Sequence, residues 1–236
     1  MTTAINTRNL RLFSALLVML QQHRSGVSWS HDLGAYVWNS NGRIVSDAKI
    51  QSQLDNIVDE FHKNVERLAE RLDNGNLTIA QWQERMKQEI LDIHRTQYTV
   101  GRGGVDQMTP RDWGRLGSDL RWMHYDSLDG FALDISNGKQ LPDGTFRPYT
   151  ESEIRARSKL YMNSSNKQYW RGKTEAKIAA GYVTEQRFLN PAEHCGDCTG
   201  YAAQGRVPIG TLPPPGEDSE CQANCKCTMK FYKAGE

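Results

Sequence analysis

The sequence has almost no net charge and no long hydrophobic run. Its 29 basic and 28 acidic side chains leave a formal net charge of +1, which excludes nucleic-acid binding through overall charge and leaves only local basic patches. The longest apolar stretch, residues 12–20, spans nine positions and is interrupted only by Ser14. A bilayer-spanning helix needs roughly 20 apolar residues, so we predict a buried helix and no membrane partner. A secretory signal is the alternative, although residues 21–24 offer no cleavage site.

The sequence also lacks the motifs of common enzymes. It has no His-Glu-x-x-His, no Gly-x4-Gly-Lys-Ser/Thr and no Gly-x-Ser-x-Gly. None of its 6 histidines is followed two positions later by Glu, as the nucleobase deaminases require before their Cys-x-x-Cys. We therefore predict no catalytic site and expect that the protein is not an enzyme.

Apolar residues recur every three or four positions through residues 46–181, which predicts a helical body. The clearest stripe comprises Ile50, Leu54, Ile57, Phe61, Val65, Leu68 and Leu72. Capping boxes begin further helices at Thr78 and Thr150, and a cap followed by proline begins another at Thr109. Four residues are expected to face inward from that helix, namely Trp113, Leu116, Leu120 and Met123. The helix that begins at Thr150 is expected to continue to Ala180.

Strand and turn signals mark the rest of the chain. The Asn41-Gly42 pair between residues 35–38 and 43–45 predicts a β-hairpin. Residues 129–148 are predicted as a loop, residues 182–189 as a strand, and the chain from 190 onward as turn-rich. The expected fold class is mainly α: a multi-helix body with a short N-terminal β-hairpin and a small C-terminal α+β or irregular cysteine-bound module. The expected divisions are residues 1–45, 46–181 and 182–236.

All five cysteines lie in the last 42 residues, and they are Cys195, Cys198, Cys221, Cys225 and Cys227. The Cys-x-x-Cys pair has the spacing of a metal knuckle, and the other three thiols follow a 22-residue loop. A structural zinc site is the favoured interpretation. Disulfides are an alternative, since the odd number of cysteines leaves one thiol over. A redox-active Cys-x-x-Cys is another alternative, although the thioredoxin-type context is missing.

Three weaker candidates accompany the cysteines. His194 adjoins Cys195 and is either a fifth ligand or, as we favour, a residue that faces solvent at the turn. Asp126 and Asp129 could chelate a cation with His124, but a solvated helix end is the favoured interpretation. The glycine-rich residues 101–104 lack the strand–helix setting of a phosphate loop and are interpreted as a hinge.

Residues 147–190 carry a local positive charge, with nine basic against four acidic side chains. Aromatic residues, including Tyr161, Tyr169 and Trp170, are interleaved with these charges. Such a segment could contact DNA or an acidic partner surface, but a solvated face with its aromatics turned to the core is the favoured interpretation. The candidate contact residues are Arg155, Arg157, Lys159, Lys167, Arg171, Lys173 and Lys177.

A set of short motifs marks the C-terminal stretch: residues 185–189 (EQRFL), 194–198 (HCGDC), 201–202 (YA), Gly205, 212–213 (LP), 215–216 (PG), Cys221 and 224–227 (NCKC). In these motifs the stretch resembles the end of phage Mu F-like minor head proteins. The resemblance covers about the last 50 residues well and the helical body only in outline. The departure is Cys221, where many members have His, so the identity of the four ligands stays open.

The resemblance implies a minor capsid or head morphogenesis protein that is assembled in the host cytoplasm and becomes part of the virion. Its expected partners are the portal, the major capsid protein or both. Packaged double-stranded DNA is a further candidate partner, through the basic residues of 147–190. The family brings no catalytic residues to carry over. Two alternatives are a metal-dependent nuclease or hydrolase and a regulatory nucleic-acid-binding protein.

Overall fold

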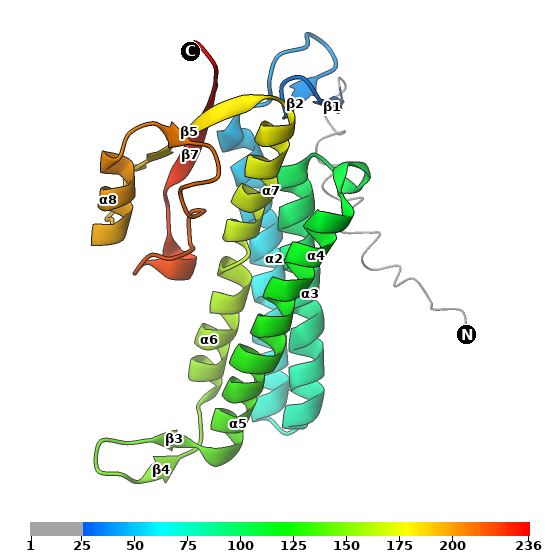
Figure 1. Cartoon of the computed structure of the whole chain (residues 1–236). Coiled ribbons are helices and arrows are strands. Elements are labelled where there is room, and N and C mark those ends of the chain that lie inside the picture. The colour runs from blue at the N-terminus through cyan, green and yellow to red at the C-terminus, as the bar shows by residue number, and fades with distance from the viewer. Residues whose placement is uncertain (1–25) are drawn as a thin grey trace.

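The computed structural model describes residues 26–236, apart from the side chain of Tyr125. These residues are mainly helical, and the long helices lie lengthwise beside one another (Figure 1). The helices are α2 (Asp47–Asp73), α3 (Ile79–Arg102), α4 (Pro110–Trp122), α5 (Asp129–Asn137), α6 (Glu151–Asn163), α7 (Asn166–Ala179) and α8 (Gly196–Ala203). The predicted fold class is confirmed. The run at residues 12–20, predicted as a buried helix, lies outside the described residues.

Short strands complete the chain in three small antiparallel sheets. The strands are β1 (Val27–Ser30), β2 (Ala35–Trp38), β3 (Lys139–Gln140), β4 (Phe146–Arg147), β5 (Tyr182–Phe188), β6 (Val207–Pro208) and β7 (Thr228–Lys233). The β1–β2 and β3–β4 pairs lie at opposite ends of the helical body (Figure 1). The third sheet, in the order β6-β5-β7, lies beside α7. Across residues 26–236, every helix is either too short or too polar to span a lipid bilayer.

The helix starts follow the capping signals of the sequence. The side chains of Thr78 and Thr150 each accept a hydrogen bond from the backbone N–H three residues on. The side chains of Gln81 and Glu153 in turn accept one from the backbone N–H of Thr78 and Thr150, which completes the capping boxes. Thr109 caps α4 in the same way, with Pro110 at the first helical position. Because these side chains satisfy backbone N–H groups that have no partner within the helix, they fix where each helix begins.

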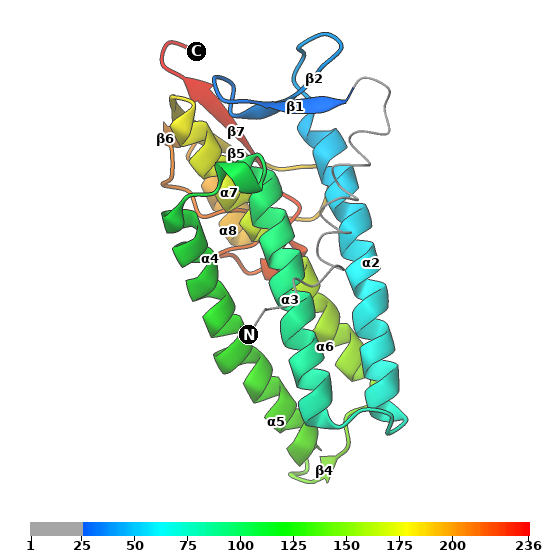
Figure 2. The same cartoon turned by 90° about the vertical axis from the view of Figure 1, so that its right-hand side faces the viewer.

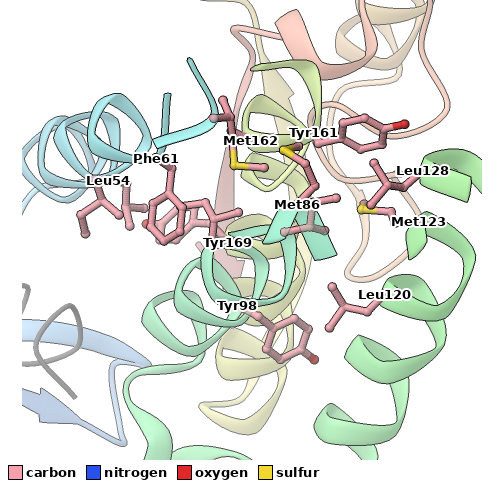
Figure 3. Close-up of a cluster of buried hydrophobic side chains, with 14 of the residues drawn as sticks. Leu54, Phe61, Met86, Tyr98, Leu120, Met123, Leu128, Tyr161, Met162 and Tyr169 are labelled. Atoms are coloured by element: carbon pink, nitrogen blue, oxygen red, sulfur yellow. The ribbon is translucent and has the colours of Figure 1, made fainter. Parts of the chain in front are cut away.

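One hydrophobic core runs through the helices (Figure 3). Leu54 and Phe61 contribute to it from α2, Met86 and Tyr98 from α3, and Tyr169 from α7. It also includes Leu212 and Met229 from the C-terminal part, whose side chains are 6% and 1% exposed. The C-terminal sheet is thus packed on the helical body by apolar side chains, while the predicted division into residues 1–45, 46–181 and 182–236 stays a prediction.

The segment at residues 129–148, predicted as a loop, contains α5 and the β3–β4 hairpin instead. Helix α5 begins without a cap, because the chain continues from α4 through the π-helical turn η2 (Met123–Leu128) (Figure 2). Buried Phe131 and Ala132 hold α5 in place. Tertiary packing therefore outweighs the weak helix propensity of this glycine- and asparagine-containing sequence.

The single helix predicted from Thr150 to Ala180 is two helices, α6 and α7, separated at Ser164 and Ser165. Both serine hydroxyls donate to backbone carbonyls three residues earlier, over 2.8 Å from Ser164 to Tyr161 and 2.6 Å from Ser165 to Met162. Hydroxyl groups that bond to carbonyls in this way compete with the helical ladder. The break follows from this pair of serines.

Two smaller expectations also need correction. Trp113 is 37% exposed rather than turned inward, because it lies at the edge of the stripe formed by Leu116, Leu120 and Met123. The Asn41-Gly42 turn does bring Val37 and Ile44 together, but only as a single β-bridge. The N-terminal hairpin is instead β1–β2, with Val27 opposite Trp38.

Candidate metal centre

The five cysteine thiols converge beside the C-terminal sheet, as their spacing predicts. Cys195 immediately precedes α8 and Cys198 lies within it, whereas Cys221 and Cys225 flank the 3-10 turn η3 (Gln222–Asn224). Cys227 directly precedes β7. The Cys198 sulfur lies 3.5 Å from the Cys221 sulfur and 3.6 Å from the Cys225 sulfur. Cys198 and Cys227, which are 29 positions apart in the sequence, thus belong with Cys225 to one group that could hold a metal ion.

The spacing between the sulfurs is that of metal ligands and not of disulfides. All five cysteines are free, and the 3.5 Å between Cys198 and Cys221 is far longer than the roughly 2.05 Å of a disulfide bond. Two sulfurs bound to one tetrahedral zinc ion at about 2.3 Å would lie about 3.8 Å apart. The cluster therefore needs only small side-chain adjustments to surround an ion.

Burial separates the thiols into an inner and an outer group. Cys198, Cys225 and Cys227 are buried, with exposures of 0%, 5% and 2%, whereas Cys195 and Cys221 are partly exposed. The thiols themselves form a small core that is separate from that of the helices. The inner thiols are shielded from solvent, and the outer two close the cluster on its exposed side.

Hydrogen bonding and burial shift the pKa values of two thiols in opposite directions. The backbone N–H of Cys198 donates to Cys195 and lowers the pKa of that thiol to about 7. Burial raises the pKa of Cys198 well above its ordinary value, and neighbouring thiols add to the rise. The lowered pKa favours the thiolate form of Cys195, which is the form that binds a metal ion.

His194 lies next to one of the inner thiols, Cys227. Its Nδ1 atom is 3.6 Å from the Cys227 sulfur, and its Nε2 atom donates a hydrogen bond of 2.6 Å to the carbonyl oxygen of Asn190. The ring is half-buried. The bond to Asn190 assigns the ring proton to Nε2, so Nδ1 presents a lone pair to the cluster.

Arg187 places a buried positive charge beside the cluster. Its side chain is 1% exposed, stacks 5.1 Å from the ring of Tyr201, and donates from Nη2 to the carbonyl oxygen of Pro213. Within residues 26–236, its Nε and Nη1 atoms have no hydrogen-bond partner. Burial raises the pKa of Cys227, and the charge of Arg187 opposes part of that rise. A buried cation without a full set of partners favours negative charge nearby.

Arg187 was not predicted as part of the metal site. Residues 184–187 (TEQR) are all polar, so polarity does not reveal the buried side of β5, and only the two-residue period of a strand turns Glu185 and Arg187 to the same buried side. Glu185 accepts a hydrogen bond of 2.8 Å from the backbone of Leu212 and so holds the loop that lies across Arg187.

The seven basic residues predicted to contact DNA or a partner do not form one exposed stripe. Five are in ion pairs: Arg155 with Glu151, Arg157 with Asp134, Lys159 with Glu66, Arg171 with Asp119 and Glu217, and Lys173 with Asp47. Lys173 and Lys177 are buried, at 7% and 8% exposure, and Lys177 donates to the carbonyl oxygen of Leu33 over 2.7 Å. A contact with DNA stays a prediction, and most of these charges already have partners.

The second candidate metal site comprises Asp126, Asp129 and His124, and its residues make other contacts. Asp129 pairs with Lys87 over 3.1 Å and accepts a hydrogen bond of 2.5 Å from Gln83. Burial lowers the pKa of His124, which favours its neutral form. In the described part of the chain, Asp126, Asp129 and His124 do not come together as a metal-binding group.

The glycine-rich segment closes a helix rather than opening one. Helix α3 continues to Arg102, and Gly103 caps it in a left-handed conformation with φ of 101°. The turn leads through η1 (Val105–Gln107) to α4.

Comparisons of the chain with protein-family models, with curated proteins and with solved structures found no match.

Proposed function

We propose that the protein is a minor structural component of a phage head, associated with the portal or the inner capsid, and that zinc bound by the cysteine cluster holds its C-terminal part in shape. The observation that carries this proposal is the gathering of five free thiols within the stretch that resembles the phage Mu F-like minor head proteins. The class of head protein is proposed from the resemblance, and the bound metal is proposed from the cluster of thiols.

The donor set is suited to zinc. Zinc at structural sites is bound by four soft ligands in a tetrahedron, and thiolates are its commonest partners there. The unpartnered nitrogens of Arg187 also fit, because several thiolates around one divalent ion leave a net negative charge next to that guanidinium. Burial of Cys198, Cys225 and Cys227 resembles a closed structural site more than an open catalytic one.

A metal would stabilise a part of the chain that has little other regular structure. Between β5 and β7, the chain forms only α8, the two-residue strand β6 and the turn η3. Binding of zinc to a structural thiolate site contributes on the order of 10–16 kcal/mol at neutral pH, and this is folding energy for the residues around it. The metal would therefore fix the C-terminal part against the helical body, as a building block of an assembly needs.

The proposed place in the head is tested by fractionation. The tagged chain is produced together with the other head genes of the same genome, and the particles are purified by sedimentation. We expect the chain to sediment with the heads in a small number of copies. Its absence from purified particles, together with normal head assembly after its gene is deleted, would overturn the proposal.

The proposed metal is tested on the purified chain. Elemental analysis after expression in zinc-containing medium is expected to give at least one zinc ion per chain, and thiol titration of the chelated protein is expected to give five free thiols. A chain without metal whose thiols titrate as disulfides would instead support the disulfide alternative.

A further inference from the structure

We infer that the cysteine cluster is a binuclear centre, in which Cys198 bridges two metal ions and His194 is a ligand of one of them. This inference rests on the proposed zinc binding and goes beyond it, because a single tetrahedral ion needs only four of the donors present. The class of ligand is a pair of divalent ions that favour sulfur, with zinc as the first candidate.

The thiols form two groups of three that share one member. Cys195, Cys198 and Cys221 have sulfurs within 4.8 Å of one another, and so do Cys198, Cys225 and Cys227. Cys198 is thus the only thiol common to both groups, and it is fully buried. Two tetrahedra that share one corner place the shared ligand next to all the others, which matches the position of Cys198.

We assign the fourth ligand of the inner ion to His194, which lies next to one of the three inner thiols, Cys227. Neutral imidazole is a common zinc ligand, and a ligating His usually donates its other ring N–H to a carbonyl or carboxylate. His194 meets this description, since its Nε2 donates to Asn190 over 2.6 Å while its Nδ1 faces the Cys227 sulfur at 3.6 Å. The inner ion would thus be held by Cys198, Cys225, Cys227 and His194.

The outer group has oxygen donors at its rim. Cys195, Asp197 and Glu220 present ligand atoms within 4.8 Å of one another, and both carboxylates are exposed. Asp197 also accepts a hydrogen bond of 2.9 Å from the backbone of Glu220, which joins the α8 side of the site to the loop that carries Cys221. The outer ion would be held by three thiolates and completed by a carboxylate or a water molecule.

A single ion would leave two of these donors without a role. Four cysteines would satisfy it, so the fifth thiol and the oriented nitrogen of His194 would stay beside the ion unused. The two-ion arrangement uses five thiols and the imidazole. It also makes the outer ion, with its exposed oxygen ligand, the easier of the two to exchange.

The number of ions per chain is the first test, measured by native mass spectrometry and elemental analysis of the full chain loaded with zinc. Two ions support the inference. One ion overturns it and leaves the proposed zinc binding intact, whereas no ion overturns both. Cys195→Ser and Cys227→Ser change one group each, so each variant is expected to retain one ion; retention of two ions by either variant would also contradict the inference.

Cadmium NMR of the cadmium-loaded chain tests the role of His194 without relying on the number of ions alone. We expect two resonances, one for each donor set. His194→Asn should shift or remove one resonance and leave the other in place. His31→Asn, which changes an exposed histidine, is the matched control and should shift neither. A spectrum that His194→Asn leaves unchanged would exclude this histidine as a ligand.

Discussion

Gly101 of α3 and Gly172 of α7 lie against each other where the two helices pack most closely. A Cβ atom added to Gly101 would lie 2.1 Å from the carbonyl oxygen of Tyr169, and one added to Gly172 would lie 2.3 Å from the carbonyl oxygen of Tyr98. Real Cβ atoms do not approach backbone that closely, so each glycine is required by the other helix. This contact sets the distance between α3 and α7.

Gly172→Ala is therefore expected to destabilise the protein. Forcing a methyl group into this contact should cost about 1–3 kcal/mol of unfolding free energy, because the helix backbones must move apart. The measurement is urea unfolding followed by circular dichroism. Gly114→Ala in α4 is the matched control, since nothing lies within 4 Å of its added Cβ, and it should instead stabilise by about 0.5–1 kcal/mol. Equal effects of the two substitutions would disprove the close contact.

His94 should make the helical body sensitive to acid. Burial lowers the pKa of this fully buried side chain to about 3. Below its ordinary pKa of about 6.5, the unfolded chain takes up a proton that the folded chain does not, so stability falls as the pH drops toward 3. The contribution of one such group is at most about 1.4 kcal/mol per pH unit.

His94→Gln should remove this contribution, because glutamine can still donate to the carbonyl oxygen of Tyr161, which His94 Nε2 meets at 3.1 Å. Urea unfolding between pH 7 and pH 4 is the measurement, and the difference in slope from the parent protein is the result that matters. The exposed His31 provides the control substitution, His31→Gln. A variant with the parent's slope would rule out His94 as the source.

The buried carboxylate of Asp112 should be among the most costly side chains to remove. It accepts hydrogen bonds from the Tyr98 hydroxyl over 2.8 Å, from Arg102 Nε over 3.0 Å and from the Thr109 backbone over 2.8 Å. Asp112→Ala leaves these donors without a partner and should cost about 3–5 kcal/mol. Asp106→Ala changes an exposed carboxylate nearby and should lie within about 0.5 kcal/mol of the parent. A similar thermal shift for both would contradict the role assigned to Asp112.

Removal of metal should loosen the C-terminal part and spare the helices. We expect a chelator to increase protease cleavage within residues 190–227, while most of the helical circular dichroism signal persists. The physical reason is that the thiols form their own small core, whereas the helices are held by a separate apolar one. Added zinc should restore protection. Cleavage that chelation does not change would argue against a stabilising metal.

Arg187→Met should weaken metal binding, because it removes the positive charge beside the thiols and keeps most of the apolar side chain. Loss of a residue that supports a metal site from outside the ligand shell commonly costs 10–100-fold in affinity. A competition titration with a coloured chelator measures the change. Arg206→Met is the control, since Arg206 also stacks on a tyrosine, 3.6 Å from the ring of Tyr232, but is exposed. Equal metal affinities of the two variants would show that Arg187 does not support metal binding.

The sequence was sufficient for the features that depend on local signals. The apolar stripe from Ile50 to Leu72 and the capping residues Thr78, Thr109 and Thr150 correctly indicated where helices lie and begin. The convergence of the cysteines was predictable too, because Cys-x-x-Cys places two thiols in one turn and so calls for further ligands elsewhere in the chain.

Features that depend on tertiary contacts were not predictable in this way. Helix α5 has no cap of its own and is held by the burial of Phe131. Lys173 and Lys177 look like surface charges in the sequence, yet Lys173 is buried beside Asp47 and Lys177 beneath the β1–β2 turn. Whether a charge is exposed or buried depends on which element packs over it, and spacing along one helix carries no such information.

Two lysines from much later in the chain form hydrogen bonds to the turn between β1 and β2. Lys177 donates to the carbonyl oxygen of Leu33, and Lys233 of β7 donates to that of Asp32 over 3.0 Å. During synthesis on the ribosome, this early turn must therefore wait for nearly the whole polypeptide to emerge before its final contacts form. The order of folding runs against the order of translation here, so a ribosome-bound chain that stops before β7 would keep that turn accessible to a protease.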